Sequence, residues 1–321
     1  MCINPIRAKF SWSINNRFRT PVVIMKPDEP YKECDRPVLL PCGKCVGCLE
    51  NRKFYWVNRM KLENELHDCG TFLTLTYNDE NLPEKCIKSD VQKFIKRLRN
   101  VSRDYDISIP CDFKYFFVSE RGSRSDRPHY HAVIFGIDMM SDEWLPRLAT
   151  FKDGYPVYCS TVVEKLWPFG FNVVAPVTGA NIGYVAKYIV KQDSDDCFNL
   201  KSLGIGNGYV YDIKRQGRKL NYTLRPDSRE LLERGRVHLP SRNSVDEVYL
   251  PKNVYQKLWD VDFELACDCM LLRRLNVRRY KDNNEFQEAK KRFLASYENK
   301  QKKQKLKGKI NDEKIRNINS R

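Results

Sequence analysis

Two histidines in the segment Pro128-His129-Tyr130-His131 have the spacing of a metal site. Alternate side chains of a strand share a face, so His129 and His131 project together while Tyr130 points to the opposite side, against the predicted helices. Two adjacent imidazoles repel each other when both are protonated, which favours a metal ion between them. A pair of ordinary half-buried histidines is the alternative.

A carboxylate is expected beside these histidines. The polar loop 121–128 separates two segments rich in aromatic and β-branched residues, and a hairpin is the shortest connection between them. Glu120 then lies almost opposite His129, with Cβ atoms about 4.5–5.5 Å apart. Only His67 and His238 remain elsewhere, so a third imidazole is not expected. Two imidazoles and a carboxylate suit Mg²⁺ or Mn²⁺ bound to a substrate phosphate better than a closed zinc site.

Two tyrosines four residues apart form a second candidate group. On a helix Tyr184 and Tyr188 lie one above the other, about 5–6 Å apart, and Lys187 and Lys191 repeat the same spacing beside them. Such a pair is most often an aromatic ridge against a core. A phenol has a pKa of about 10, so as a nucleophile it needs nearby cations or a metal-polarised substrate. The two lysines and the metal site could provide both.

Three cysteines, Cys42, Cys45 and Cys48, follow two successive C-x-x-C steps. This spacing places three soft ligands on one tight loop, with Cys34 a possible fourth thiolate for structural zinc. A second C-x-x-C pair is missing, so cysteines packed without metal and an iron–sulfur cluster stay open as alternatives.

The composition indicates a basic globular protein. The 321 residues include 57 Lys and Arg against 41 Asp and Glu, a net charge of +16. This excess favours a polyanionic partner, nucleic acid before an anionic membrane surface. No apolar run approaches the length of a membrane span, and the N-terminus lacks the features of a secretory signal. We therefore expect a cytoplasmic protein without a membrane partner. No Walker A loop indicates an ATP-driven helicase.

The elements that would hold these residues alternate between strands and helices. Their order, β-α-β-β-α-β-α, predicts an α+β fold in which an antiparallel sheet carries helices on one face, as in ferredoxin-like or RNA-recognition-like domains. The expected strands are 71–77, 113–120, 130–136 and 172–176, and the expected helices are 49–66, 89–98, 141–149, 161–166 and 180–192. We expect four segments: a Cys-rich segment with a basic helix (1–69), the core (70–195), an irregular extension (196–252) and a helical region with a basic tail (253–321).

Three motifs in this core resemble those of HUH endonucleases, the initiators of rolling-circle replication. They are FLTLTY, SERGSRSDRPHYHAVIFG and GYVAKYIVKQ, spread over residues 71–192. The paired tyrosines resemble the two-tyrosine initiators of small single-stranded DNA bacteriophages. The segment PCGKCVGCLENRK is similar to the Cys-rich segment of Microviridae initiators of the gokushovirus type.

The resemblance implies a role for each matching residue. His129 and His131 match the metal-binding histidines, Glu120 matches the acidic third ligand of the replication branch, and Tyr184 and Tyr188 match the paired nucleophiles. The relaxase branch uses a third histidine, which has no counterpart here. Tyrosine between the histidines is bulkier than the hydrophobic residue usual in the family.

The activity that the resemblance implies is strand transfer on origin DNA. One tyrosine attacks a phosphodiester of single-stranded or supercoiled origin DNA, leaving a 5′-phosphotyrosine and a 3′-OH that the host polymerase extends behind a host helicase, in the bacterial cytoplasm. The second tyrosine permits circle closure and repeated rounds without ATP. We expect Lys187 to assist catalysis. The expected DNA contacts are Arg121, Arg124, Arg127 and Lys191.

Two other functions remain compatible with the residues. A non-catalytic nucleic-acid-binding protein would need only the basic charge, the sheet and a zinc loop. A metal-dependent phosphodiesterase that uses water would cut DNA without forming a covalent link to a tyrosine.

Overall fold

The structure is a computed structural model that describes residues 5–10, 22–25, 29–30, 37–122, 126–152, 155–189, 196–216, 219–241 and 244–275. Contacts divide the chain into two compact units, Met1–Gly206 and Asn207–Arg321. Among the described residues, no helix combines the length and the apolar composition needed to cross a bilayer.

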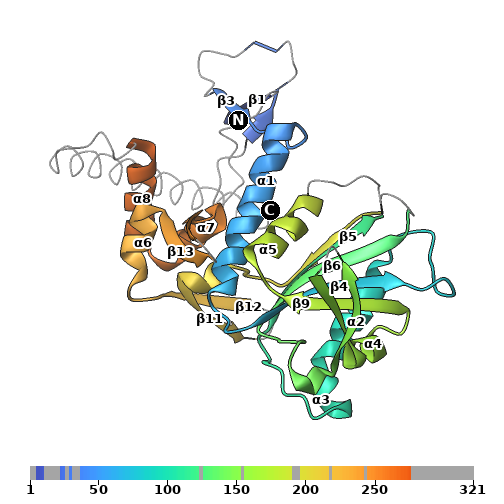
Figure 1. Cartoon of the computed structure of the whole chain (residues 1–321). Coiled ribbons are helices and arrows are strands. Elements are labelled where there is room, and N and C mark those ends of the chain that lie inside the picture. Colours follow the sequence, from blue (N-terminus) through green and yellow to red (C-terminus); the bar gives the residue numbers. More distant parts are fainter. Residues whose placement is uncertain are drawn as a thin grey trace, which may run out of the picture. The chain divides into compact units, whose positions relative to one another are not determined.

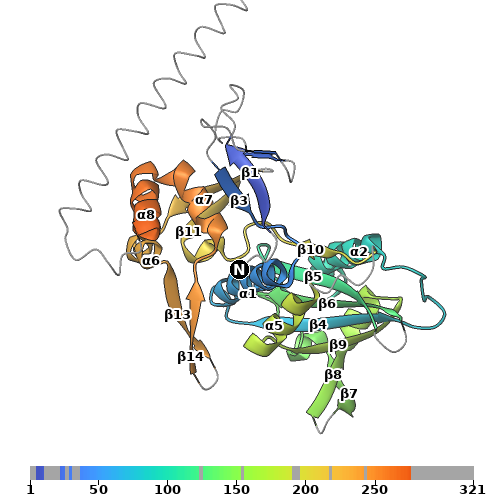
Figure 2. The ribbon, with the colours of Figure 1, turned by 90° about the horizontal axis from the view of Figure 1, so that it is seen from above.

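A seven-stranded antiparallel sheet forms the centre of the first unit (Figures 1 and 2). Its strand order is β10-β5-β6-β4-β9-β8-β7. The strands are β4 (Gly70–Tyr77), β5 (Lys114–Arg121), β6 (Pro128–Phe135), β7 (Pro146–Lys152), β8 (Tyr155–Ser160), β9 (Gly170–Pro176) and β10 (Asn199–Lys201). The four strands expected from the sequence correspond to β4, β5, β6 and β9, within one or two residues at each end.

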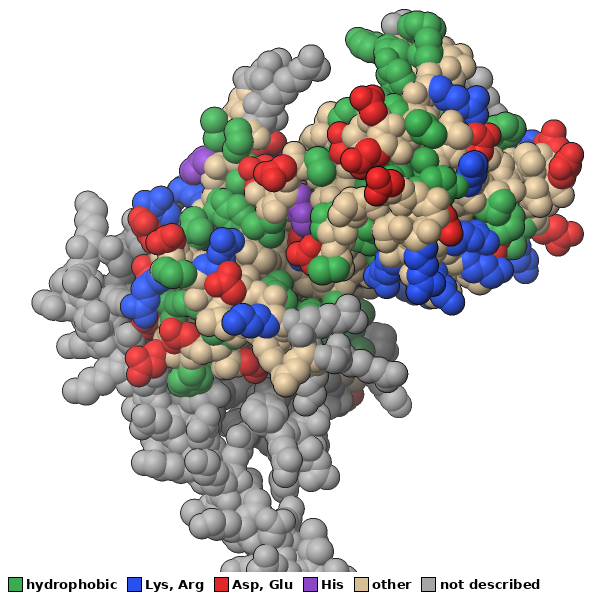
Figure 3. Space-filling model, turned by 90° about the horizontal axis from the view of Figure 1, so that it is seen from below, with side chains coloured by type: hydrophobic (Ala, Val, Ile, Leu, Met, Phe, Trp, Pro, Cys, Tyr) green, Lys and Arg blue, Asp and Glu red, His purple; other side chains and the backbone are tan. Residues whose placement is uncertain are grey.

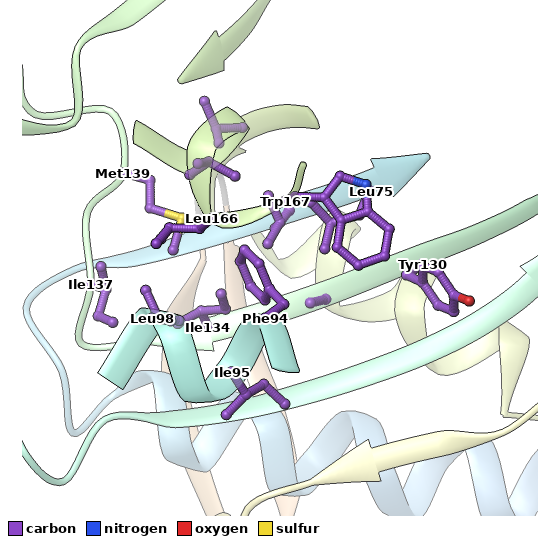
Figure 4. Close-up of a cluster of buried hydrophobic side chains, with 14 of the residues drawn as sticks. Leu75, Phe94, Ile95, Leu98, Tyr130, Ile134, Ile137, Met139, Leu166 and Trp167 are labelled. Carbon is purple, nitrogen blue, oxygen red and sulfur yellow. The ribbon is translucent and has the colours of Figure 1, made fainter. Parts of the chain in front are cut away.

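The strand β4 shows why the sheet has two different faces. Leu73, Leu75 and Tyr77 are buried on one face, while Phe72 and Thr74 are half-buried on the other. This alternation follows from the two-residue period of a strand. The buried face packs on an apolar cluster that includes Phe94, Tyr130 and Trp167 (Figure 4).

Helices cover both faces of this sheet, so the expectation of helices on one face is wrong. On one side lie α2 (Lys88–Arg99), α3 (Val101–Asp104) and α4 (Thr161–Leu166), and on the other lie α1 (Val46–Asn64) and α5 (Gly179–Tyr188). The physical reason is that β5 and β6 are apolar on both faces: Phe117 and Ile134 join the cluster under α2, and Phe116 and Val133 join the cluster under α1 and α5.

Tyr130 points toward α2, as the sequence predicted. It is fully buried, and its hydroxyl accepts a hydrogen bond from the Ile87 backbone N–H at 2.7 Å. The hydroxyl of Tyr77 lies 3.0 Å from that of Tyr130 and donates to Asp90 Oδ2 at 3.0 Å. These contacts join the start of α2 to the sheet beneath the two histidines, and they satisfy polar groups that would be costly to bury alone.

The carboxylate of Glu63 connects the end of α1 to the sheet. It is 1% exposed and lies 2.8 Å from the Lys114 ammonium. It also accepts hydrogen bonds from His67 Nε2 at 2.9 Å and from the Gly206 backbone N–H at 2.6 Å. Burial raises the pKa of Glu63, but the hydrogen bond from His67 and the charge of Lys114 outweigh burial and lower it overall.

The helix expected over 141–149 is not formed. A single 3₁₀ turn, η1 (Asp142–Trp144), ends at Leu145 with φ 49°, and β7 begins at Pro146. Proline lacks the N–H that a helix interior needs, and the left-handed residue before it reverses the chain. The segment instead joins β8 in a hairpin that extends the sheet.

Three short strands near the N-terminus form a separate antiparallel sheet in the order β2-β1-β3. They are β1 (Ile6–Phe10), β2 (Val22–Ile24) and β3 (Pro37–Leu40). The basic helix expected over 49–66 is present as α1, three residues earlier at its start.

The second unit contains two hairpins and three helices where the sequence predicted an irregular extension followed by helices. Its elements are η2 (Asn207–Tyr209), β11 (Tyr211–Gln216), β12 (Lys219–Leu224), α6 (Ser228–Arg234), β13 (Arg236–Ser241), β14 (Ser244–Tyr249), α7 (Lys252–Val261) and α8 (Phe263–Leu275). Its strands escaped prediction because they are short and rich in charged residues. The basic tail lies outside the described residues.

Candidate functional site

The hairpin of β5 and β6 places Glu120 directly opposite His129, as the sequence predicted. On its other side β6 pairs with β4, where Thr74 lies opposite His131. Opposite residues of antiparallel strands project to the same face. One face of three neighbouring strands therefore carries Glu120, both histidines and Thr74.

His131 is the centre of this group. It is 6% exposed, and its Nε2 donates a hydrogen bond to Oε1 of Glu120 at 2.8 Å. On its other side Nδ1 is hydrogen-bonded to Oγ1 of Thr74 at 2.9 Å. Burial raises the pKa of Glu120, but its hydrogen bond and charge interaction with His131 lower it further than burial raises it. The imidazole is thus fixed at both nitrogens.

His129 is held at one nitrogen only. Its Nδ1 donates to the backbone carbonyl of Arg127 at 2.6 Å. A carbonyl oxygen can only accept, so Nδ1 carries a proton and Nε2 of the neutral ring keeps its lone pair for a ligand. Histidines that bind metals commonly use their second nitrogen in this way.

The donor set therefore fits a divalent ion in its chemistry. The atoms are not gathered as tightly as in a formed metal centre: in the described part of the chain, the group whose three candidate ligand atoms lie within 4.8 Å of one another is Cys42, Cys45 and Cys48. Glu120 and His131 are already in contact, and His129 is the more distant member of the predicted triad.

The two tyrosines extend from α5 onto the same group. The side chain of Thr178 caps the helix by accepting from the Asn181 N–H at 3.2 Å. The helix buries Ile182, Val185 and Ala186. The tyrosines lie on the flank of this buried stripe.

The phenols of Tyr184 and Tyr188 are in direct contact with each other and with His131. The Tyr188 hydroxyl donates to the Tyr184 hydroxyl at 2.8 Å. The His131 ring lies 5.1 Å from Tyr184, edge to face, and 5.4 Å from Tyr188, stacked. Phe72 completes the group, with its ring centroid 6.0 Å from both His131 and Tyr184.

The surroundings of the two phenols differ. Burial raises the pKa of Tyr188 well above its usual value, and the hydrogen bond with Tyr184 and the charge of Glu120 add to this shift. Tyr184 is 40% exposed. In the resting state Tyr188 is therefore a neutral phenol with its oxygen directed at Glu120 and Tyr184, while Tyr184 faces solvent.

Lys187 lies on α5 between the tyrosines in sequence and is exposed. Among the described residues, no hydrogen bond joins its ammonium to either phenol. Lys191 and Arg124, which the sequence proposed as DNA contacts, lie outside the described residues.

The other two loop arginines are engaged with acidic residues. Arg121 forms two hydrogen bonds to Asp126, at 2.9 and 2.8 Å, and a third to Asp196 at 3.2 Å. Arg127 pairs with Asp79 at 2.6 Å. A DNA phosphate would have to displace these carboxylates to bind either guanidinium.

The three cysteines before and within the first turn of α1 lie close together. Sγ of Cys42 lies 3.9 Å from that of Cys48 and accepts a hydrogen bond from the Cys45 N–H at 3.4 Å. Cys45 is the residue that precedes the helix. The tight turn needs the left-handed conformation of Gly43, φ 75°. This arrangement could hold a metal such as zinc. Cys34 lies outside the described residues.

Sequence reasoning missed two members of the site, Thr74 and Phe72. Both lie in the FLTLTY segment, which was expected beside the histidine strand, and the structure places β4 there. The signal was available in the alternation of this segment: Phe72 and Thr74 share the face opposite Leu73 and Leu75. What the sequence could not give was the pairing partner of Thr74.

Comparison with known proteins supports a replication protein. Residues 70–193 match the model of a family of replication-associated proteins that is named after ORF2. The chain is 32% identical over 163 residues to replication-associated protein ORF2 of Spiroplasma virus 4, covering 48% of each chain. It is 34% identical over 155 residues to replication-associated protein ORF4 of Chlamydia phage 1, covering 48% of this chain and 38% of that one.

A third relative is matched over more of its length. The chain is 28% identical over 244 residues to replication-associated protein VP4 of Bdellovibrio phage phiMH2K, covering 70% of this chain and 72% of that one. The chain spans about half or less of the length of the Spiroplasma and Chlamydia phage proteins. No solved structure matches it. The resemblance to Microviridae replication proteins is confirmed.

Proposed function

We propose that this chain, which resembles the replication-associated proteins of Microviridae phages, is an endonuclease and strand transferase that initiates rolling-circle replication. The observation that carries the proposal is the contact of two phenols, 2.8 Å apart, with an imidazole that is itself bound to Glu120. A packed aromatic ridge needs neither a shared hydrogen bond nor a carboxylate at its end.

The fold of the core supports the same proposal. The strands β5, β6, β4 and β9 are adjacent in this order and antiparallel. Helix α2 lies between β4 and β5 in sequence, and α4 precedes β9. This is the order of a ferredoxin-like sheet, the core that HUH endonucleases are expected to have. We propose 70–195 as this core, flanked by segments 1–69, 196–252 and 253–321.

The proposed cofactor is Mg²⁺ or Mn²⁺, held by Glu120, His129 and His131. When bound, such an ion polarises the scissile phosphate and stabilises the charge that develops on its oxygens. Thr74 orients the ring of His131, and the carbonyl of Arg127 fixes the proton of His129 on Nδ1. These two contacts present Nε2 of each ring on the same face of the sheet.

The nucleophile is a phenol oxygen of Tyr184 or Tyr188. It forms a bond to phosphorus, the bond from phosphorus to the 3′ oxygen breaks, and the phenol proton passes to that oxygen to give a 3′-OH. The products are a 5′-phosphotyrosine and a primer end, so the transfer needs neither water nor ATP. Lys187 is proposed to stabilise negative charge beside the tyrosines.

The second tyrosine permits the reverse reaction on a regenerated origin. It cleaves the new junction while the 3′-OH displaced there attacks the first phosphotyrosine and closes a circle. The proposed partners are single-stranded or supercoiled origin DNA and the host polymerase and helicase, in the bacterial cytoplasm. Arg121, Arg124, Arg127 and Lys191 are proposed DNA contacts.

For the cysteine cluster we propose structural Zn²⁺. Three thiolates on a tight turn at the start of α1, one of them already accepting a backbone N–H, are the ligands that zinc prefers. Cys34 would be a fourth ligand.

The experiment that tests the proposed function traps the covalent link. A random pool of single-stranded oligonucleotides, labelled at the 3′ end, is incubated with the protein and Mn²⁺ and analysed on a denaturing gel. Label that migrates with the protein shows a 5′-phosphotyrosine, because only the fragment downstream of the cut stays attached. A pool labelled at the 5′ end serves as the control and leaves the protein unlabelled.

Two outcomes contradict the proposal. Binding of the pool with no labelled protein supports a non-catalytic nucleic-acid-binding protein. Cleavage with no labelled protein supports a phosphodiesterase that uses water.

A further inference from the structure

A pair of cations lies around the indole of Trp56, at the edge of the sheet that β10 forms. The guanidinium carbon of Arg59 lies 4.4 Å from the centroid of the indole, and Nζ of Lys201 lies 4.8 Å from it. Arg59 is fixed further by hydrogen bonds from Nε to the Ile205 carbonyl at 2.8 Å and from Nη1 to the Tyr55 hydroxyl at 3.0 Å. Two positive charges are thus held at one aromatic ring.

The charges of this pair are not neutralised by acidic side chains. Within the described part of the chain, neither Arg59 nor Lys201 has a carboxylate partner, and the polar partner of the Lys201 ammonium is the Asn199 amide oxygen at 2.6 Å. An aromatic face attracts a cation but carries no net charge to cancel it. The pKa of Lys201 is lowered by burial and by the charge of Arg59, so the two cations repel each other.

The loop arginines give the opposite case. Arg121 is matched by Asp126 and Asp196, and Arg127 by Asp79. A phosphate gains most where it meets cations that have no competing carboxylate. By this criterion Arg59 and Lys201 are better placed to bind a phosphate than Arg121 and Arg127 are.

The register of the sheet places the cation pair on the same face as the candidate active site. Lys201 lies opposite Phe116 in the pairing of β10 with β5, and its ammonium lies 5.8 Å from the Phe116 ring. Phe116, Val118 and Glu120 follow one another at every second residue of β5 and therefore share a face. Four residues of strand span about 13 Å, so the pair lies a few nucleotides from Glu120 along a bound strand.

We propose that Arg59 and Lys201 bind the phosphate backbone of a single DNA strand a few nucleotides away from the scissile bond. The proposal rests on the proposed function for the choice of DNA as the ligand. Lys201 is exposed and makes the direct contact, while Arg59, 9% exposed, acts mainly by keeping the local potential positive. A strand that follows β5 toward β10 would pass both the tyrosines and this pair.

The test measures binding separately from cleavage. A fluorescein-labelled oligothymidylate, with no Mg²⁺ or Mn²⁺ added, is titrated with the full chain by fluorescence anisotropy at several salt concentrations. Lys201→Met removes the charge but keeps an unbranched stem against Trp56 and Phe116, and Lys201→Glu reverses the charge. The matched control is Lys96→Glu, an equal change of net charge on α2.

The control position belongs to a different surface. Lys96 is exposed on the outer side of α2, as are Lys88, Lys93 and Arg99, and Figure 3 shows Lys and Arg side chains gathered on the side of the sheet that α2 covers. This is the face opposite to that of Trp56. A charge change there alters the net charge of the protein without touching the proposed site.

Lys201→Met is expected to weaken binding roughly three- to tenfold at low salt, and the slope of log K against log salt should fall by about 0.7, the value for one lost phosphate contact to a single strand. Lys201→Glu should weaken binding more, and Lys96→Glu less than either. Equal effects of Lys201→Glu and Lys96→Glu, or no change in slope for Lys201→Met, would overturn the proposal.

Two further measurements separate the possible causes. Inorganic phosphate at the same ionic strength should compete no better than chloride, because a strand offers several phosphates at once, whereas strong competition would indicate a site for free phosphate instead. Thermal unfolding of each variant shows whether it is folded. Loss of the covalent adduct with unchanged Lys201-dependent binding would contradict the proposed chemistry and leave this site intact.

Discussion

The hydroxyl oxygens of Tyr184 and Tyr188 lie 2.8 Å apart on one side of α5, joined by a hydrogen bond. Both rings contact the His131 imidazole. A small movement of either phenol therefore brings it to the position of the other, and a single phosphate bound beside His131 lies within reach of both.

The first prediction concerns the division of labour between these tyrosines. Tyr184→Phe and Tyr188→Phe should each keep part of the adduct formation, because one phenol oxygen remains, and the double variant should form none. The gel assay with the 3′-labelled pool measures this. Tyr155→Phe, at a tyrosine that is 75% exposed on β8, is the control. An adduct in the double variant would show that another residue is the nucleophile.

The second prediction concerns Thr74 as a positioning residue. Thr74→Val keeps the shape of the side chain but removes the hydroxyl bound to Nδ1 of His131, and loss of such a support typically costs about 10–100-fold in metal affinity or activity. We expect a higher Mn²⁺ concentration for half-maximal adduct formation, with oligonucleotide binding unchanged.

The neighbouring Thr76 offers a matched control. It lies on the same face of β4, but its hydroxyl donates to the Phe171 carbonyl at 3.4 Å and not to a histidine. Thr76→Val should leave the Mn²⁺ dependence unchanged. Equal behaviour of the two variants would mean that the Thr74 hydroxyl does not orient His131.

The third prediction is a pH dependence of stability from Glu63. Its pKa is lowered below the usual 4.5 in the folded protein, so its contribution is fully present above pH 4.5 and is lost as the pH falls through the lower folded value. Glu63→Gln should lower the free energy of unfolding by about 3–5 kcal/mol near neutral pH, because it leaves a buried Lys114 without its partner.

Urea unfolding at several pH values measures this effect. The difference between wild type and Glu63→Gln should narrow as the pH falls below 4.5. Removing the opposite charge as well, in Glu63→Gln with Lys114→Met, should recover part of the lost stability at pH 7. A difference that is the same at all pH values would show that the ion pair is not the source.

The fourth prediction concerns the cysteine cluster. If Cys42, Cys45 and Cys48 bind Zn²⁺, about one equivalent should survive purification, and a chelator should lower the melting temperature because structural zinc contributes directly to folding. Mass spectrometry under native conditions counts the metal. Cys45→Ser should lose it, and the exposed Cys111→Ser should not. Full zinc content in Cys45→Ser would exclude this cluster as the site.

Local rules were sufficient to predict the pairing of Glu120 with His129 and the stacking of Tyr184 on Tyr188. The first follows from the two-residue period of a strand and a short loop, and the second from the period of a helix. Contacts between distant segments were not predictable in this way. Thr74 reaches His131 only because β4 lies between β6 and β9, and no local pattern specifies that order.

The loop arginines show the same limit for charge. The sequence places Arg121 and Arg127 in a basic loop beside the histidines, which favours phosphate binding. Their partners Asp196 and Asp79 are 75 and 48 residues away. The charge of a side chain can be read from sequence, but its neutralisation depends on which acidic residues the fold brings to it.

The order of the strands also has a consequence for the time at which the site first exists. Thr74 lies in a central strand, whereas Tyr188 is made 114 residues later. At a translation rate of about 5–20 residues per second this interval lasts roughly 6–23 seconds. During that time the emerging polypeptide already carries its histidines and Glu120 but has no phenol to attack a phosphodiester. The ability to link itself to DNA is thus acquired only after the strands that hold the histidines have been synthesised, so an unfinished chain on the ribosome cannot become attached to the genome.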